Sequence, residues 1–318
     1  MPRQDRGPPW KLTMYDGQGS KILTEEPGDD GVLEYEAMGA AEAMSMTQNQ
    51  TGRPPVLLIH GMWCTAEALF ELRDAFERAG FPVVAPSLPL HMDKANYDDQ
   101  QRAALARTSL QDYLTFLMEQ VSSLETAPIL VGHSMVGLLA QLLAARVPCN
   151  RLVLLSSAAP GGINSWSWPM VRTFGRNLLL FPLWRHVMEL RAGNVRYGIA
   201  NSQSAATQQW ILDHATYESG TAAFQIGIGG LLRNGFSRVN PRNVQCPVLV
   251  LGGTEDRITP IGIQRQIAGK YAGRSRLIEI QGACHWTVGG RYVNRIATEI
   301  LAWLDGVSRD GKSDPALA

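Results

Sequence analysis

Cysteine is scarce in this sequence, and its few residues form no recognisable pattern. The four cysteines, Cys64, Cys149, Cys246 and Cys284, lie far apart and include no C-x-x-C pair. Scattered cysteines exclude a disulfide framework and a cysteine-based zinc site, so we expect reduced and mostly buried thiols. A cytoplasmic protein is therefore the first expectation.

An excess of charge, long apolar runs and metal-binding patterns are missing as well. The 29 basic residues balance the 29 acidic ones, which argues against nucleic acid or an anionic membrane surface as a partner. The first nine residues lack the apolar core of a signal peptide, and no apolar run is long enough to cross a bilayer, so we expect no stable membrane association. No two histidines have the i, i+4 spacing of a metal site. We expect no metal and no cofactor.

One stretch carries most of the information that is present, residues 127–137 with Ser134 at its centre. Residues 128–131 form a compact apolar run typical of a buried strand, and residues 135–147 have the composition of a buried helix. A serine on the short turn between them would have strained backbone geometry, with its hydroxyl lifted towards the start of the helix. There the N–H of Met135 would face a developing oxyanion. The alternative is an ordinary turn whose serine caps the helix.

Strand-like runs alternate with helical patterns along the chain from residue 54 onwards. Strands are expected at 56–59, 81–85, 151–155, 247–251 and 276–280, and helices at 66–79, within 105–124 and at 293–304. This alternation predicts an α/β fold, in which a parallel sheet has helices on both faces. Before it, two edge strands are expected at 10–15 and 31–38, with a loop or short helix at 40–53.

Two further candidate residues, Asp256 and His285, each come shortly after a predicted strand. Because the carboxyl ends of parallel strands meet at one edge of a sheet, we expect Ser134, Asp256 and His285 to come together. A nucleophilic serine needs an imidazole that takes its proton and a carboxylate that orients the imidazole. The alternatives are Glu255 as the acid and a surface position for His285.

These residues give the sequence a resemblance to the α/β-hydrolase superfamily, in particular to its lipase- and esterase-like members with a lid. The resemblance covers about residues 54–305 and rests on four motifs: His60-Gly61, Gly132-His-Ser-Met, Gly253-x-x-Asp-x-x-x-Pro260 and Gly282-x-x-His285. They follow the superfamily's chain order of serine, acid and histidine.

The resemblance implies a mostly parallel central sheet and an inserted helical cap. It assigns Ser134 as nucleophile, with Asp256 and His285 as its partners. It also implies oxyanion donors at the backbone N–H groups of Met62 and Met135, with Trp63 as the alternative to Met62. His60, His91 and His133 are expected to be structural.

The sequence departs from the family at Val136, where a glycine usually follows two residues after the nucleophile. Glycine comes one position later, at Gly137. A β-branched side chain at this position requires either a slightly displaced turn or a small residue on the neighbouring strand.

Residues 161–243 interrupt the alternation and fall where the superfamily places its cap. Helices are expected there at 170–180, 183–192 and 207–217. The aromatic residues of this segment would line an apolar substrate pocket or form the cap's own core. Trp63 and Trp286 are also expected to line the pocket.

The expected domain organisation is an N-terminal extension at 1–53, an α/β-hydrolase core at 54–160 and 244–306, the cap at 161–243, and a disordered tail at 307–318. The function expected from the resemblance is a serine hydrolase that cleaves a carboxylic ester, or a lactone-like acyl bond, of a small and fairly apolar substrate through an acyl-enzyme. The alternatives are a carbon–carbon bond hydrolase or hydroxynitrile-lyase-like enzyme on the same scaffold, and a non-catalytic ligand receptor. The expected partner is a small molecule, and the N-terminal extension leaves a homodimer open.

Overall fold

The computed structural model describes residues 12–15, 21–25, 52–229 and 235–306 of the chain, which divides into two compact units at residue 42. In the first unit, β1 (Leu12–Tyr15) and β2 (Lys21–Glu25) form an antiparallel hairpin. Strand β1 lies within a predicted strand, whereas β2 was not predicted because it is a short run enclosed by turn-rich sequence. Several predictions lie outside the described residues: the strand at 31–38, most of the loop or short helix at 40–53, and the tail at 307–318.

A parallel sheet of six strands, in the order β10-β9-β6-β5-β3-β4, organises the second unit. The strands are β3 (Val56–Ile59), β4 (Val83–Val84), β5 (Ile129–His133), β6 (Arg151–Leu155), β9 (Val248–Gly253) and β10 (Ser275–Ile280). The central strands are almost continuous runs of buried apolar residues, as expected where helices cover both faces of a parallel sheet. The predicted α/β fold is confirmed.

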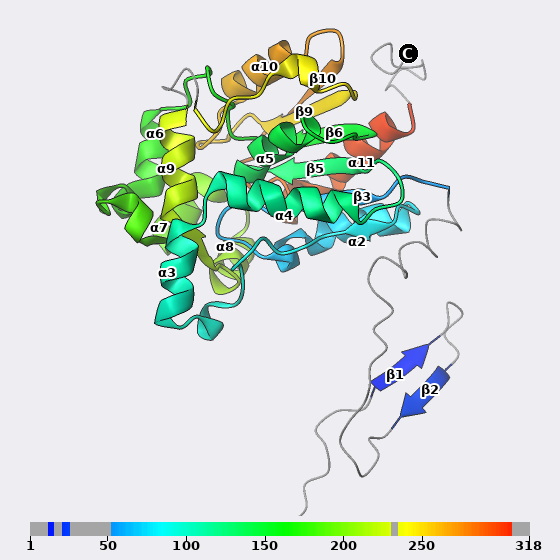
Figure 1. Cartoon of the computed structure of the whole chain (residues 1–318), viewed down its shortest axis with the longest axis horizontal. Helices are drawn as coiled ribbons and strands as arrows, with labels where there is room; N and C mark the ends of the chain where they lie inside the picture. The colour runs from blue at the N-terminus through cyan, green and yellow to red at the C-terminus, as the bar shows by residue number, and fades with distance from the viewer. Residues whose placement is uncertain (1–11, 16–20, 26–51, 230–234, 307–318) are drawn as a thin grey trace, which may run out of the picture. The chain divides into compact units, whose positions relative to one another are not determined.

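Helices cover the two faces of this sheet (Figure 1). In β3, Val56 and Leu58 point into one hydrophobic core, and the alternate residues Leu57 and Ile59 point into the other, because successive side chains of a strand face opposite sides. The first core is closed by α2 (Phe70–Arg78) and α11 (Val293–Leu304). The second is closed by α4 (Leu110–Ser122), α5 (Met135–Ala144) and α10 (Ile261–Lys270).

The order of the strands fixes where a site can form. After β3 the chain moves outwards to β4 and then returns to β5, on the other side of β3. This reversal leaves a crevice at the carboxyl ends of β3 and β5, and ligands of open α/β sheets bind at such a switch point. The residues that follow these two strands are His60 and Ser134.

Two helices occupy the region in which the sequence indicated a single helix within 105–124. The chain forms α3 (Asp99–Arg107) and α4, and each begins with a capping box, at Asp98 and Ser109 respectively. Each capping residue satisfies a free N–H group of its own helix. The helix boundary at Ser109 therefore follows from local capping.

The segment at 161–243 contains α6 (Trp168–Phe174), α7 (Ala192–Asn194), α8 (Ala205–Asp213) and α9 (Gly220–Gly229), which group at one end of the sheet (Figure 1). It also contains a two-stranded antiparallel sheet of β7 (Val187–Glu189) and β8 (Tyr217–Ser219). The predicted helix at 183–192 is therefore wrong. Met188 is fully buried, and pairing with β8, distant in sequence, overrides the helical spacing of the segment.

Gly137 provides the close packing that Val136 cannot provide. Val136 is fully buried in the core beside α4, whereas a Cβ atom at Gly137 would lie 2.6 Å from Ser157 Cβ and 2.9 Å from Ser157 Cα. Ser157 comes just after β6, so α5 approaches its neighbouring strand at a small residue. Val136 is accommodated because the close approach is one position further along.

We expect Gly137→Ala to lower the free energy of unfolding by about 1–3 kcal/mol, because the added methyl group overpacks against backbone. Urea denaturation measures the effect. Gly269→Ala is the matched control, since a Cβ there meets nothing within 4 Å and alanine favours the helix by about 0.5–1 kcal/mol. A Gly137→Ala protein as stable as the wild type would contradict the packing argument.

Candidate active site

Ser134 occupies a strained turn between β5 and α5. Its backbone angles are φ 57° and ψ −125°, in a region that side-chain-bearing residues rarely adopt. Its side chain makes no capping hydrogen bond to the helix, so the alternative of a helix-capping serine does not apply. The strain instead holds the hydroxyl at the switch point of the sheet, where it can react.

The three side chains expected to come together form one hydrogen-bonded line. Ser134 Oγ lies 2.8 Å from His285 Nε2, and His285 Nδ1 lies 2.9 Å from Asp256 Oδ2. Because the carboxylate can only accept, Nδ1 carries the proton and Nε2 is free to accept one from the serine. All three residues are buried, with Ser134 retaining 8% exposure and His285 3%.

Asp256 is held as a carboxylate by several donors. Its Oδ1 accepts from the N–H groups of Ile258 and Thr259, both at 2.8 Å, and the Thr259 hydroxyl donates to Oδ2 at 2.9 Å. Burial by itself would raise the pKa of Asp256, but the facing His285 and these hydrogen bonds outweigh it and lower the pKa. Glu255, the alternative acid, is exposed.

The residues that carry the predicted oxyanion donors, Met62 and Met135, line a cavity together with Ser134. Met135 is the first residue of α5, so its N–H has no partner within the helix. Met62 lies on the turn after β3 and lines the same cavity as Ser134 and Met135. Trp63 does not line that cavity, and its carbonyl accepts from the Thr216 N–H at 2.9 Å. These positions favour Met62 over Trp63 as the second donor.

His133 and His60 support the loops around the site. The His133 Nε2–H donates to the His285 carbonyl at 2.9 Å, and His60 Nδ1–H donates to the Gly61 carbonyl at 2.9 Å while Nε2 accepts from the Leu88 N–H. Burial, and then the neighbouring His285, lowers the pKa of His133 to about 3. Burial, and then the neighbouring His91, likewise lowers the pKa of His60 to about 3. Both side chains are therefore neutral.

Two cavities meet at Ser134. The larger one is lined almost entirely by apolar side chains of the core and of residues 161–243, the cap segment, among them Met62, Ala159, Met170, Phe174, Leu183 and Ile226. The smaller one lies beside His285 and includes Trp63, Cys64, Leu190, Ile199 and Trp286. Trp63 and Trp286, predicted to line the pocket, thus line the smaller cavity. The sequence signal for the larger one was the apolar and aromatic content of the cap segment, which did not single out individual residues.

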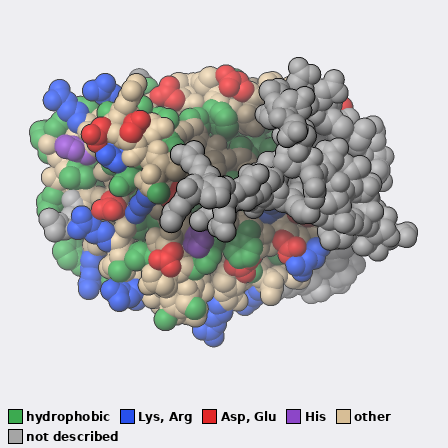
Figure 2. Space-filling view, turned by 90° about the horizontal axis from the view of Figure 1, so that it is seen from below, with side chains coloured by type: hydrophobic (Ala, Val, Ile, Leu, Met, Phe, Trp, Pro, Cys, Tyr) green, Lys and Arg blue, Asp and Glu red, His purple; other side chains and the backbone are tan. Residues whose placement is uncertain are grey.

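Other kinds of site are not visible in the described part of the chain. No cluster of three or more His, Cys, Asp or Glu residues that could hold a metal occurs among the described residues. None of the helices described is long and apolar enough to span a bilayer. On the face shown in Figure 2, basic and acidic side chains of the described residues are interspersed with apolar ones.

Comparisons with known proteins agree with this fold. The sequence profile described as "Alpha/beta hydrolase family" matches residues 56–289. The fold is similar to that of polyneuridine aldehyde esterase, with a TM-score of 0.59 and 16% identity over 80% of this chain and 100% of that one. No curated protein sequence matches the chain.

Two further solved structures have comparable similarity. A methylesterase from Arabidopsis has a TM-score of 0.60 and 14% identity, over 80% of this chain and 100% of that one. The monoacylglycerol lipase of Paleococcus ferrophilus has a TM-score of 0.59 and 21% identity, over 79% of this chain and 95% of that one. At such identities the similarity concerns the fold.

Proposed function

Since this chain belongs to the alpha/beta hydrolase family, we propose that it is a serine hydrolase that cleaves a carboxylic ester, or a lactone-like acyl bond, of a small and fairly apolar substrate. The observation that carries the proposal is the line from Asp256 through His285 to Ser134, with spacings of 2.9 Å and 2.8 Å. This is the arrangement that activates a serine hydroxyl for attack on an acyl carbon.

The proposed reaction proceeds through an acyl-enzyme. As Ser134 Oγ attacks the carbonyl carbon, its proton moves to His285 Nε2, and Asp256 stabilises the imidazolium that forms. The N–H groups of Met62 and Met135 donate to the carbonyl oxygen, which becomes negatively charged. His285 then gives its proton to the leaving alcohol, and the same steps with water in place of the serine release the acid.

The two cavities support a substrate that extends from the scissile bond in two directions. The larger cavity is apolar and partly formed by the cap segment, which suits an acyl chain or ring. The smaller cavity adjoins His285, where the leaving alcohol receives its proton. Three proteins of similar fold, two esterases and a lipase, also favour ester substrates. The four free thiols, all in the described residues, favour the cytoplasm.

A fluorophosphonate probe and a series of p-nitrophenyl esters test the proposal. We expect the probe to label Ser134, as located by peptide mass mapping, and we expect steady hydrolysis of short and medium acyl esters. Labelling at another residue, or cleavage of a β-diketone or cyanohydrin with negligible ester turnover, would overturn the proposal.

Narrowing the larger cavity tests its role as the acyl site. We expect Ala159→Leu to lower kcat/KM for the octanoate ester by about tenfold or more. The larger side chain would exclude two to three methylene groups of the acyl chain from the cavity, and the burial of each contributes about 0.8 kcal/mol. Activity on the acetate ester is the internal control and is expected to stay within about twofold. An equal loss on both esters would contradict the assignment.

A further inference from the structure

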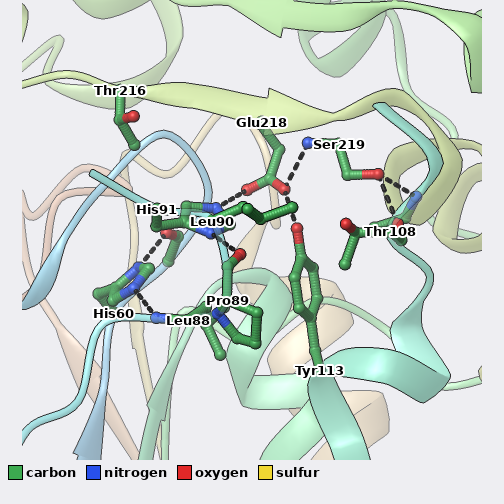
Figure 3. Close-up of polar contacts among 12 residues, drawn as sticks. His60, Leu88, Pro89, Leu90, His91, Thr108, Tyr113, Thr216, Glu218 and Ser219 are labelled. Carbon is green, nitrogen blue, oxygen red and sulfur yellow. Dashed lines mark hydrogen bonds and ion pairs between the residues drawn. The ribbon is translucent and has the colours of Figure 1, made fainter. Parts of the chain in front are cut away.

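A second carboxylate, Glu218, is fully buried outside the triad, and Figure 3 shows its polar contacts. It lies on β8 of the cap segment, and its side chain reaches the core. Its Oε1 accepts from the Tyr113 hydroxyl of α4 at 3.0 Å and from the Ser219 N–H at 2.7 Å. Its Oε2 lies 3.3 Å from His91 Nε2. A buried carboxylate lowers stability unless such partners compensate for its lost hydration.

The hydrogen bonds fix how many protons Glu218 and His91 hold. His91 Nδ1 lies 3.1 Å from the carbonyl oxygen of Pro89, which can only accept, so Nδ1 carries a proton. The contact between Nε2 and Oε2 then requires one more proton, on either atom. The pair therefore has no net charge and joins β8 to the loop that follows β4.

The loop after β4 and the residues that lead into β8 both support the turn at 61–63, which carries Met62. The His91 ring packs against His60, with ring centroids 5.1 Å apart, and His60 holds the Gly61 carbonyl at 2.9 Å. From the other side, the Thr216 N–H, two residues before Glu218, donates to the Trp63 carbonyl at 2.9 Å. The turn at 61–63 is thus held at both ends by groups that Glu218 connects.

We propose that Glu218 is a positioning residue which, through His91 and Tyr113, holds β8 and the turn at 61–63 in register and so orients the Met62 N–H towards the reacting carbonyl. This inference rests on the proposed function, because the Met62 N–H is given its role there. It adds a requirement for a specific cap-segment side chain that never touches the substrate.

The surroundings of Glu218 support a role that depends on hydrogen bonding. Burial, and then the neighbouring Glu218, raises the pKa of Cys64 to about 12. Burial, and then Glu218, also holds the pKa of Tyr113 well above its usual value. Both neighbours are therefore neutral, and His91 is the one basic side chain within hydrogen-bond reach of Glu218 in the described residues. Loss of the carboxylate would remove the hydrogen-bond partner of the Tyr113 hydroxyl and of His91 Nε2.

Two substitutions at Glu218 separate positioning from charge. In Glu218→Gln, the amide oxygen still accepts from Tyr113 and Ser219, and the amide N–H donates to a neutral His91, so every hydrogen bond is kept. In Glu218→Ala they are lost. We expect Glu218→Gln to retain kcat within about threefold. We expect Glu218→Ala to lose about 10–100-fold in kcat with KM within about threefold, because displacing an oxyanion donor costs less than the roughly 10²–10³-fold cost of removing one.

A matched pair of tyrosines covers the case in which Glu218→Ala does not fold. Tyr113 and Tyr271 are both fully buried, and each donates one 3.0 Å hydrogen bond to a buried side-chain oxygen, on Glu218 and Gln141 respectively. We expect Tyr113→Phe to lower kcat by about threefold or more and Tyr271→Phe to leave it unchanged. Rates are normalised to active sites titrated with the phosphonate.

Hydrogen exchange gives a readout that needs no activity. We expect Glu218→Ala or Tyr113→Phe to speed exchange of the Leu88 and Thr216 amides, which donate to His60 and Trp63, while Glu218→Gln and Tyr271→Phe do not. A Glu218→Ala or Tyr113→Phe protein without accelerated exchange, or with unchanged kcat per titrated site, would overturn the positioning role. A Glu218→Gln protein as impaired as Glu218→Ala would overturn it too. If wild type cleaves no ester, the proposed function fails, and the exchange data still decide whether Glu218 holds the turn.

Discussion

Ser134→Ala is expected to lower kcat for p-nitrophenyl ester hydrolysis by at least about 10⁴-fold while the protein stays folded. The methyl group keeps the shape of the side chain but removes the hydroxyl, whose oxygen lies 2.8 Å from His285 Nε2 and is the proposed nucleophile. Substrate binding is expected to persist because the two cavities are unchanged. The loss therefore falls on kcat, with KM within a few-fold of wild type.

Ser156→Ala is the matched control for this experiment. Ser156 follows β6 as Ser134 follows β5, it also has a positive φ of 44°, and it is fully buried. Its hydroxyl has no hydrogen-bond partner among the described residues. We expect full activity from this variant, and circular dichroism and thermal unfolding compare the folds. If Ser134→Ala were about as active as the wild type, Ser134 could not be the nucleophile.

The central strands and the last helix could be predicted from the sequence because tertiary packing and local pattern agree there. Val56–Ile59, Arg151–Leu155 and Val293–Leu304 have the predicted boundaries. Buried parallel strands are continuous apolar runs, and α11 carries its apolar residues at helical spacing. The candidate triad followed from the same reasoning, since strand ends of a parallel sheet converge wherever their residues lie in the chain.

The cap segment could not be predicted in the same way. Val187–Glu189 becomes a strand only because Tyr217–Ser219 lies beside it, and the local sequence of neither segment predicts that pairing. Glu218 illustrates the same limit, since a single glutamate in this segment gives no sign in the sequence that it will be buried. Its partners come from α4 and from the loop after β4, more than 100 residues earlier. Such networks depend on the finished fold.

The buried histidines give a second large effect, a loss of stability in mild acid. His60 and His133 both have a pKa of about 3 in the folded protein, against about 6.5 in an unfolded chain. Below pH 6.5 the unfolded state therefore binds more protons, and stability falls as the pH falls. The slope is up to about 1.4 kcal/mol per pH unit for each histidine, and the loss continues until the pH approaches the folded value.

Between pH 6 and pH 4 the two histidines together are expected to cost about 5 kcal/mol, which is comparable with the whole stability of many domains, about 5–15 kcal/mol. Urea unfolding at several pH values measures the slope. His133→Gln removes one of the two groups, so we expect its slope to be lower by about 1.4 kcal/mol per pH unit, with the exposed His186→Gln as control. Equal slopes for His133→Gln and wild type would mean that His133 is protonated in the folded protein. Its donation to the His285 carbonyl argues against this, as does its buried Nδ1, which has no hydrogen-bond partner among the described residues.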